Sequence, residues 1–190
     1  PFIDARRVAF MGTPSTDPKL QQRCLDWGKK LTERITQDKP DMVFASTFGA
    51  GEAVDDGTGR SQQDQYKDGV TERFAEWTAA GARVYVLRDT PLTLDHSSPD
   101  CVALNQQEPL ACANTRSEAL VPDPVADAAR SMGSPRVKVL DLSDQFCNEQ
   151  LCHAVIGGLQ VYYDADHTSR SYMRSLVPVL AQRFNEARQQ

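Results

Sequence analysis

The chain alternates between helical and strand-like sequence patterns, and this alternation limits its fold more than any other feature. Apolar residues recur at helical spacing over residues 20–35 and again over 66–77. Short apolar runs lie at residues 42–45, 84–87 and 137–140. Apolar runs that alternate with helices are typical of parallel strands buried beneath helices. The pattern therefore predicts an α/β fold in which helices cover both faces of a parallel sheet.

Several helix boundaries can be predicted from capping residues and prolines. Asp17 and Asp123 each precede a proline, and this pair is typical of an N-cap followed by the first helical residue. The last helix is expected to begin near Ser169, and Pro178 predicts a bend or break within it. The buried face of this helix is predicted to consist of Met173, Leu176, Val177, Leu180 and Phe184.

The other segments are less regular. Residues 89–122 contain several prolines and predict a long irregular connection, whereas 155–162 predict a hairpin that turns on a Gly-Gly pair. Three interior strands make a narrow sheet for this length. Residues 7–11 could add a strand, and a strand ahead of Pro1 could add another; we favour the second. The length of 190 residues and the absence of repeats predict a single domain over residues 1–190.

Composition excludes two classes of function. The 21 basic and 26 acidic side chains give a net charge of −5, and no block of Lys or Arg stands out. A nucleic-acid-binding groove is therefore not expected. No apolar run approaches the roughly 18 residues that a membrane span needs, so the stretch itself is expected to be soluble.

The cysteines indicate an oxidising compartment. Cys101 with Cys112, and Cys147 with Cys152, could each close a short loop, and Cys24 is left over. Two such bridges are typical of proteins outside the cytosol, although five free thiols remain the alternative. No Cys/His spacing fits a zinc site, so no metal is expected.

Ligand and catalytic sites in open parallel sheets form where loops leave the carboxyl ends of the strands. Four loops are expected there, at residues 46–51, 89–91, 141–144 and 164–167. In the last loop Asp164 lies three residues before His167, immediately ahead of a helix start.

A general base needs an imidazole whose second nitrogen is held by a carboxylate. His167 is therefore interpreted as a general base and Asp164 as its orienting partner. An equally weighted alternative is that Asp164 and Asp166 cap the following helix and His167 is a surface residue. A metal site formed by Asp164, Asp166 and His167 is a less favoured alternative, because the sequence nearby lacks further ligands of the right kind. For His96 and His153 a solvated structural role is the expectation.

No nucleophile can be assigned from the residues alone. The chain contains neither Gly-Asp-Ser nor Gly-x-Ser-x-Gly, and the neighbours of Ser15 and Ser46 do not form a nucleophile elbow. Residues 49–51 (Gly-Ala-Gly) could offer backbone N–H groups to an oxyanion, although plain flexibility explains them as well.

Taken together in their order, these segments match a known family. From about Asp4 to Leu180 the chain resembles the extracytoplasmic SGNH domain at the C-terminus of acyltransferase-3 membrane proteins, which O-acylate bacterial surface glycans. The resemblance depends on Cys24-x-x-Trp27, the segments 39–44, 86–91 and 99–101 with Cys112, the segment 139–142 ahead of Cys147 and Cys152, and the segment 163–169.

The resemblance implies a three-layer α/β/α, flavodoxin-like fold of the SGNH-hydrolase type. Asp164 and His167 correspond to the family's Asp-x-x-His pair. The family's serine lies in a Gly-Asp-Ser-His block on the first strand, so the domain is expected to lack that strand and that serine, which would lie upstream of Pro1. The opening Pro1-Phe2 implies a start one residue after a cysteine that would pair with Cys24, and the fragment alone is expected to be inactive.

The implied activity is O-acyl transfer, most simply O-acetyl transfer, to a cell-surface glycan hydroxyl through a serine ester. His167 would deprotonate the serine and later the acceptor, while Asp164 holds the imidazole. The membrane acyltransferase domain of the same parent chain would deliver the acyl group at the extracytoplasmic face of the membrane. No CoA site or other cofactor is expected here. The alternatives are an SGNH esterase that uses water as acceptor and a non-catalytic glycan-binding domain.

Overall fold

The computed structural model describes residues 18–48, 59–93, 99–164 and 167–190. The chain divides into two compact units. We call residues 1–89 and 122–140 the sheet unit, and residues 90–121 and 141–190 the disulfide unit.

Among its described residues, the sheet unit contains three parallel strands in the order β1-β2-β4. These are β1 (Met42–Ala45), β2 (Arg83–Leu87) and β4 (Val137–Leu140), as the apolar runs predicted. In the central strand Val84 lies opposite Val43 on one side and Val137 on the other. The strands follow one another in chain order, so both connections are crossovers through helices.

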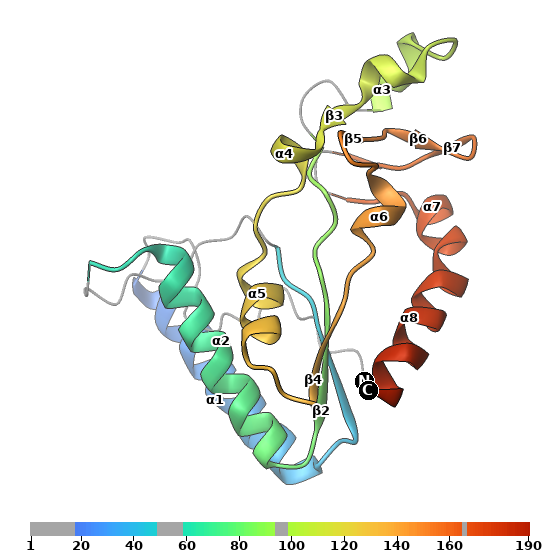
Figure 1. Cartoon of the computed structure of the whole chain (residues 1–190). Coiled ribbons are helices and arrows are strands. Elements are labelled where there is room, and N and C mark those ends of the chain that lie inside the picture. The colour runs from blue at the N-terminus through green and yellow to red at the C-terminus, as the bar shows by residue number, and fades with distance from the viewer. Residues whose placement is uncertain (1–17, 49–58, 94–98, 165–166) are drawn as a thin grey trace. The chain divides into compact units, whose positions relative to one another are not determined.

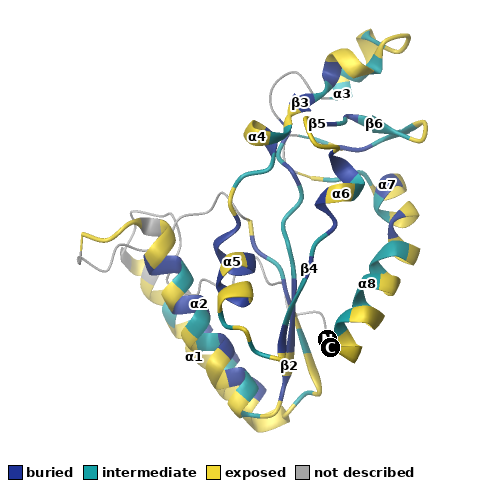
Figure 2. Cartoon of the chain, viewed as in Figure 1, coloured by how far each residue is buried: buried dark blue, intermediate teal, exposed yellow. Residues whose placement is uncertain are grey.

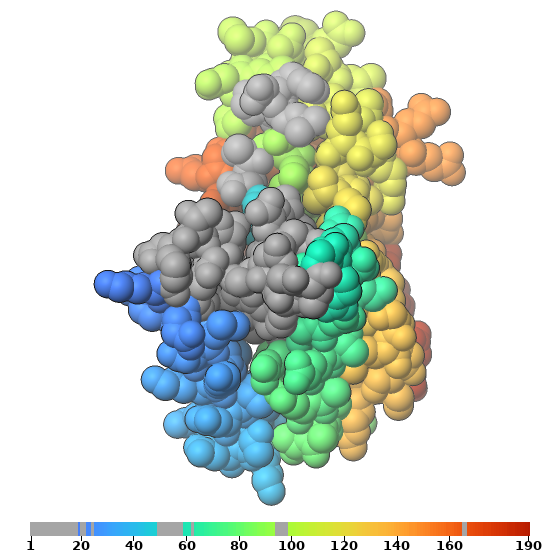
Figure 3. Space-filling model, turned by 90° about the vertical axis from the view of Figure 1, so that its left-hand side faces the viewer, coloured from blue at the N-terminus to red at the C-terminus, as the bar shows by residue number. Residues whose placement is uncertain are grey.

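Three helices accompany this sheet and lie on one side of it (Figure 1). They are α1 (Pro18–Asp38), α2 (Gln62–Ala79) and α5 (Pro124–Ser131). Helix α2 packs against both α1 and α5, and the outer surfaces of α1 and α2 run side by side in Figure 3. The predicted cap of α5 is confirmed, because the Asp123 carboxylate accepts hydrogen bonds from the backbone N–H groups of Val125 and Ala126.

The core of the sheet unit is formed where α2 and α5 cover the strands. Buried residues recur along both helices (dark blue in Figure 2). Trp77 buries its ring and still satisfies its indole, which donates a 3.0 Å hydrogen bond to Thr32 Oγ1. Burial of each large side chain contributes about 1.5–3 kcal/mol. The predicted apolar stripe of α2 is confirmed, since its four members are all buried: Tyr66, Val70, Phe74 and Trp77.

Strand β1 differs from the prediction of a fully buried strand. Phe44 is 55% exposed, and its ring stacks on Tyr85 with the centroids 5.4 Å apart. The physical reason is that β1 stands at the edge of the sheet among the strands that the structure describes. An apolar run indicates a strand, but it does not distinguish an edge strand from an interior one.

The disulfide unit consists mainly of short elements. The prediction of an irregular connection over residues 89–122 is wrong in part, because four short elements lie within it: α3 (Pro99–Leu104), the 3₁₀ helix η3 (Pro109–Cys112), β3 (Asn114–Thr115) and α4 (Arg116–Ala119). Elements this short show no periodicity in the sequence. The other elements of the unit are α6 (Ser143–Phe146), β5 (Leu151–Cys152), β6 (Val155–Ile156), β7 (Leu159–Gln160), α7 (Arg170–Ser175) and α8 (Val177–Gln189).

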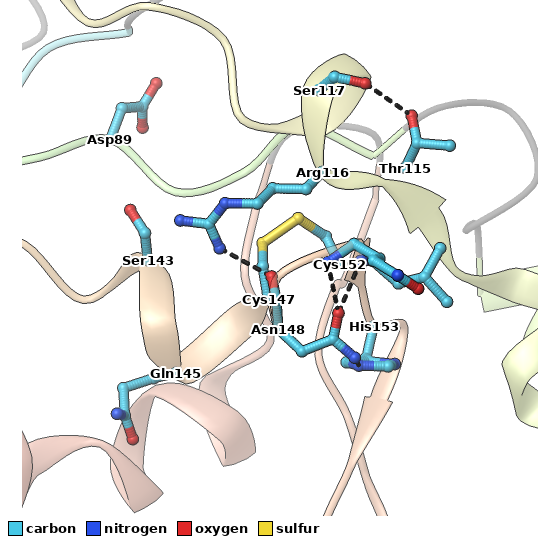
Figure 4. Close-up of a disulfide and its surroundings, with 12 residues drawn as sticks. Asp89, Thr115, Arg116, Ser117, Ser143, Gln145, Cys147, Asn148, Cys152 and His153 are labelled. Carbon is cyan, nitrogen blue, oxygen red and sulfur yellow. Dashed lines mark hydrogen bonds between the residues drawn. A yellow bond between two sulfur atoms is a disulfide. The ribbon is translucent and has the colours of Figure 1, made fainter.

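Both predicted disulfides are present. Cys101 is bonded to Cys112 and Cys147 to Cys152. The second bridge closes a tight loop over residues 147–152, shown in Figure 4. From outside this loop, Arg116 Nη1 donates a 2.9 Å hydrogen bond to the backbone oxygen of Asn148. Strand β3 also pairs with β5 at this loop. The side chain that was expected to remain unpaired, that of Cys24, lies outside the described part of the chain.

The predicted hairpin is confirmed as β6 and β7, which pair antiparallel. Gly157 and Gly158 both have positive φ, 58° and 77°, which is the conformation that a tight two-residue turn requires.

The predicted break in the last helix is confirmed at Leu176, which separates α7 from α8. Pro178 lies in the first turn of α8, where its missing N–H costs nothing. The predicted burial is confirmed for Leu176, whereas Met173, Leu180 and Phe184 are only half-buried. For Val177 the prediction is wrong, because this residue is 59% exposed. The break interrupts the regular spacing on which that prediction depended.

None of the described helices is both long and apolar enough to span a bilayer. The possible strand over residues 7–11 falls outside the described residues.

Candidate functional site

Asp164 and His167 lie in a closed turn between β7 and α7, in the disulfide unit. The backbone N–H of Tyr163 donates a 2.8 Å hydrogen bond to the oxygen of His167, and that of Ser169 donates a 2.7 Å bond to the oxygen of Val161. Between these two bonds Tyr162 and Thr168 form an antiparallel bridge. The turn is therefore closed by backbone hydrogen bonds on both sides of the bridge.

The carboxylate of Asp164 contacts the ring and the backbone of His167 at once. His167 Nδ1 lies 2.9 Å from each oxygen of the carboxylate, and the His167 backbone N–H donates a 2.8 Å bond to Oδ1. The local Asp-x-x-His spacing thus brings the two side chains together without a contribution from a distant segment. The sequence predicted this proximity correctly.

The geometry of the pair indicates which tautomer of His167 is present. A carboxylate can only accept, so the hydrogen of the neutral imidazole lies on Nδ1 and the lone pair on Nε2. The His167 side chain is 57% exposed and that of Asp164 is 43% exposed. The imidazole is therefore both oriented by a carboxylate and accessible from solvent, which are the two properties that a general base needs.

The alternative that Asp164 caps the following helix does not fit the hydrogen bonds. The N-cap of α7 is Ser169, whose Oγ accepts a 3.2 Å bond from the backbone N–H of Tyr172. The same hydroxyl donates a 2.5 Å bond to the oxygen of Gln160. Ser169 therefore joins the start of α7 to the end of β7, while the Asp164 carboxylate acts within the turn. Asp166 lies outside the described residues.

Beneath the start of α7, Tyr172 is buried. Its ring meets Phe146 edge-on with the centroids 5.3 Å apart, and its hydroxyl donates to the backbone oxygen of Gln145. Burial raises the pKa of Tyr172 to about 12, so this hydroxyl remains a neutral donor at physiological pH. These contacts attach α7, and with it the end of the Asp164–His167 turn, to α6.

Sequence reasoning missed one residue at this turn. Thr93 Oγ1 donates a 3.2 Å hydrogen bond to the backbone oxygen of Asp164 across 71 positions of sequence. A lone threonine in an irregular segment gives no sequence signal for such a contact.

The other residues singled out in the sequence are not part of this turn. All four loops are predicted to follow strands of the parallel sheet. Three of them do, but the loop over 164–167 follows the β6–β7 hairpin, so the predicted location of this loop is wrong. Ser46 is half-buried directly after β1, in the sheet unit. His153 Nε2 lies 3.2 Å from Asn148 Nδ2, beside the Cys147–Cys152 bridge (Figure 4). Ser15, His96 and residues 49–51 fall outside the described residues.

Within the described ranges, no group of three or more His, Cys, Asp or Glu side chains is arranged to hold a metal ion.

Comparison with known proteins identifies the family. Residues 3–182 match the family model of the SGNH domain that is fused to AT3 domains. The chain belongs to this SGNH family. The match extends over both the sheet unit and the disulfide unit of this SGNH domain, and the family recognised from the sequence is confirmed.

A solved structure supports the fold of this SGNH domain. The periplasmic domain of a lipopolysaccharide acetyltransferase from Salmonella ser. Paratyphi A superposes with a TM-score of 0.61 at 12% sequence identity. The alignment covers 93% of this SGNH domain and 68% of that chain. The likeness confirms the predicted α/β fold of the SGNH-hydrolase type. No curated protein matches the chain in sequence.

Proposed function

We propose that this SGNH domain carries out O-acyl transfer to a hydroxyl of a cell-surface glycan, with His167 as general base and Asp164 as its orienting carboxylate. The observation that carries the proposal is the contact of His167 Nδ1 with both oxygens of Asp164 at 2.9 Å. Support also comes from the family, whose members are fused to AT3 domains. The identities of the acceptor as a surface glycan and of the transferred group as an acyl group are proposed together with these roles.

In the first step a serine hydroxyl attacks the carbonyl carbon of the acyl donor. The serine is proposed to lie ahead of Pro1, as the resemblance to the family implies. His167 Nε2 takes the serine proton while the new oxygen–carbon bond forms, and it returns that proton to the leaving group when the donor's bond breaks. The Asp164 carboxylate stabilises the imidazolium that exists between these events.

In the second step the glycan hydroxyl attacks the serine ester. His167 Nε2 accepts the proton of the glycan hydroxyl as the new ester bond forms, and it gives the proton to the serine oxygen as the old ester bond breaks. One acyl group moves from serine to glycan, and both serine and His167 return to their starting state. General base catalysis of this kind contributes about 10²–10⁴-fold to the rate.

The membrane AT3 domain of the parent chain is proposed to present the acyl group at the extracytoplasmic face of the membrane. The two disulfides support this location, because such bonds persist in oxidising compartments outside the cytosol. The similar solved structure is also a periplasmic domain, as its description says of that protein.

A hydrolase that uses the same pair is the second candidate. The His167 side chain is 57% exposed, so water can reach it. The two candidates differ in product: transfer yields an acylated glycan, whereas hydrolysis yields a free carboxylic acid.

The test uses the full-length parent protein and measures both products. His167→Ala is expected to lower acyl transfer by about 10²–10⁴-fold, and Asp164→Asn is expected to lower it as well because the imidazole loses the carboxylate that holds it. The matched control is His153→Ala, which removes a histidine of the same unit that bonds to Asn148 instead. Full transfer activity in His167→Ala would contradict the proposed role, and formation of free acid by the unaltered protein in place of acylated glycan would favour the hydrolase.

A further inference from the structure

We propose that Thr93 is a positioning residue for the Asp164–His167 pair. The inference rests on the proposed function and goes beyond it, because it assigns a role to a residue outside the Asp-x-x-His segment. Thr93 donates a hydrogen bond of 3.2 Å from Oγ1 to the backbone oxygen of Asp164.

The contact comes from a different part of the disulfide unit. Thr93 is 71 positions away from Asp164 in sequence and is only 9% exposed. The residue before it, Leu92, is itself fixed, because its backbone N–H donates a 2.8 Å bond to the oxygen of Ala119 in α4. Thr93 therefore lies on a segment that α4 anchors, and from there it reaches the peptide of the orienting carboxylate.

The point of contact suits a positioning role. The backbone bonds of Tyr163 and Ser169 hold the two ends of the turn, whereas Thr93 holds the peptide group of Asp164 itself. The carboxylate lies only two torsions from this backbone. The bond from Thr93 holds the carbonyl that is attached to the Cα of Asp164, and so it narrows the range of positions from which the carboxylate meets His167 Nδ1.

A purely structural explanation competes with this one. A hydroxyl buried to this extent needs a hydrogen-bond partner in any case, and a nearby carbonyl would satisfy it without any effect on catalysis. The two explanations differ in what the loss of the hydroxyl does to turnover by correctly folded protein.

Thr93→Val removes the donor and keeps the shape, whereas Thr93→Ser keeps the donor. In the full-length parent we expect Thr93→Val to lower kcat about tenfold with KM for the acceptor unchanged, since small displacements of a catalytic group are costly. Thr93→Ser is expected to recover most of the rate. The matched control is Thr115→Val, which removes the hydroxyl of a threonine that bonds to Glu118 and Ser117 within the same unit.

The outcomes separate this proposal from the proposed function. Loss of activity in His167→Ala together with full kcat in Thr93→Val would overturn the positioning role and leave the base in place. A lower yield of folded Thr93→Val protein with unchanged kcat per folded molecule would overturn it too. Full activity in His167→Ala would instead contradict the proposed function, and it would also contradict the positioning role of Thr93, which depends on that function. Loss of kcat in Thr93→Val that Thr93→Ser restores and Thr115→Val does not reproduce would support the proposal.

Discussion

The two units of this SGNH domain differ in the interactions that stabilise each of them internally. In the described residues, the hydrophobic cluster that joins α1, α2, α5 and the three strands draws all its members from the sheet unit. Both disulfides belong to the disulfide unit, where most elements are two to six residues long. The sheet unit thus contains this large apolar cluster, whereas the disulfide unit combines smaller groups of buried side chains, such as Phe146 with Tyr172, with two disulfides and loop hydrogen bonds.

The difference places the candidate site on the less regular unit. The Asp164–His167 turn depends on backbone bonds, a bridge between Tyr162 and Thr168, and a contact from Thr93, not on a position within a long helix or strand. Functional residues commonly lie on loops that a scaffold positions. Here part of that scaffold consists of short elements that two disulfides fix.

The largest expected effect tests the core of the sheet unit. Phe74 is fully buried and its ring lies 5.5 Å from that of Trp77. Phe74→Ala should lower the free energy of unfolding by about 3–5 kcal/mol, because it leaves a cavity in the cluster. Denaturant unfolding followed by circular dichroism measures this loss. Phe48→Ala, at an exposed position of the same unit, is the control, and an equal loss in both variants would show that burial does not hold this unit.

A somewhat smaller effect is expected from removal of a disulfide. The bridge between Cys101 and Cys112 closes a loop with a sequence separation of 11. Replacement of both cysteines by alanine should cost about 3 kcal/mol, since the open loop gains entropy when it unfolds. Hydrogen exchange measured along the chain should show faster exchange in α3 and η3 and unchanged protection in α2. Faster exchange in α2 to the same extent would remove the contrast between the units.

The smallest of the three effects concerns alkaline pH. Burial raises the pKa of Tyr66 in the sheet unit to about 12, from an ordinary value near 10. The unfolded chain therefore loses this proton first, so stability is intact below pH 10 and falls as the pH rises toward 12. Between pH 9 and 11.5 the contribution of Tyr66 to this fall should be about 2 kcal/mol.

Tyr66→Phe removes the ionisable hydroxyl and should make the alkaline loss of stability smaller by that amount. Denaturation curves at pH 9 and pH 11.5 for both proteins measure the difference. An identical pH dependence in the two proteins would mean that Tyr66 ionises as easily in the folded protein as in the unfolded chain.

The sequence predicted the sheet unit well because long elements repeat their signals. The stripe of α2 extends over about three turns, and Asp123 marks the start of α5 with both a cap and a following proline. The error in this unit was the exposure of Phe44, because neighbouring strands decide whether an apolar strand is covered. Nothing within residues 42–45 records which strands lie beside them.

In the disulfide unit the prediction succeeded where one turn or one bond is specified locally. The Gly157-Gly158 hairpin, the two cysteine pairs and the Asp164–His167 contact all depend on residues close in sequence. The pairing of β3 with β5 and the hydrogen bond of Thr93 join distant segments of two or a few residues. Such contacts leave no periodic pattern, so the sequence alone could not reveal them.

The central claim is that the Asp164 carboxylate holds the imidazole of His167 in the tautomer that a general base needs. The direct measurement is ¹⁵N NMR of the histidine ring nitrogens at about pH 9, where an imidazole is normally neutral. We predict that the His167 ring carries its proton on Nδ1, with Nε2 unprotonated, and that Asp164→Asn disturbs this state. A ring that carries its proton on Nε2 in the unaltered protein would contradict the account.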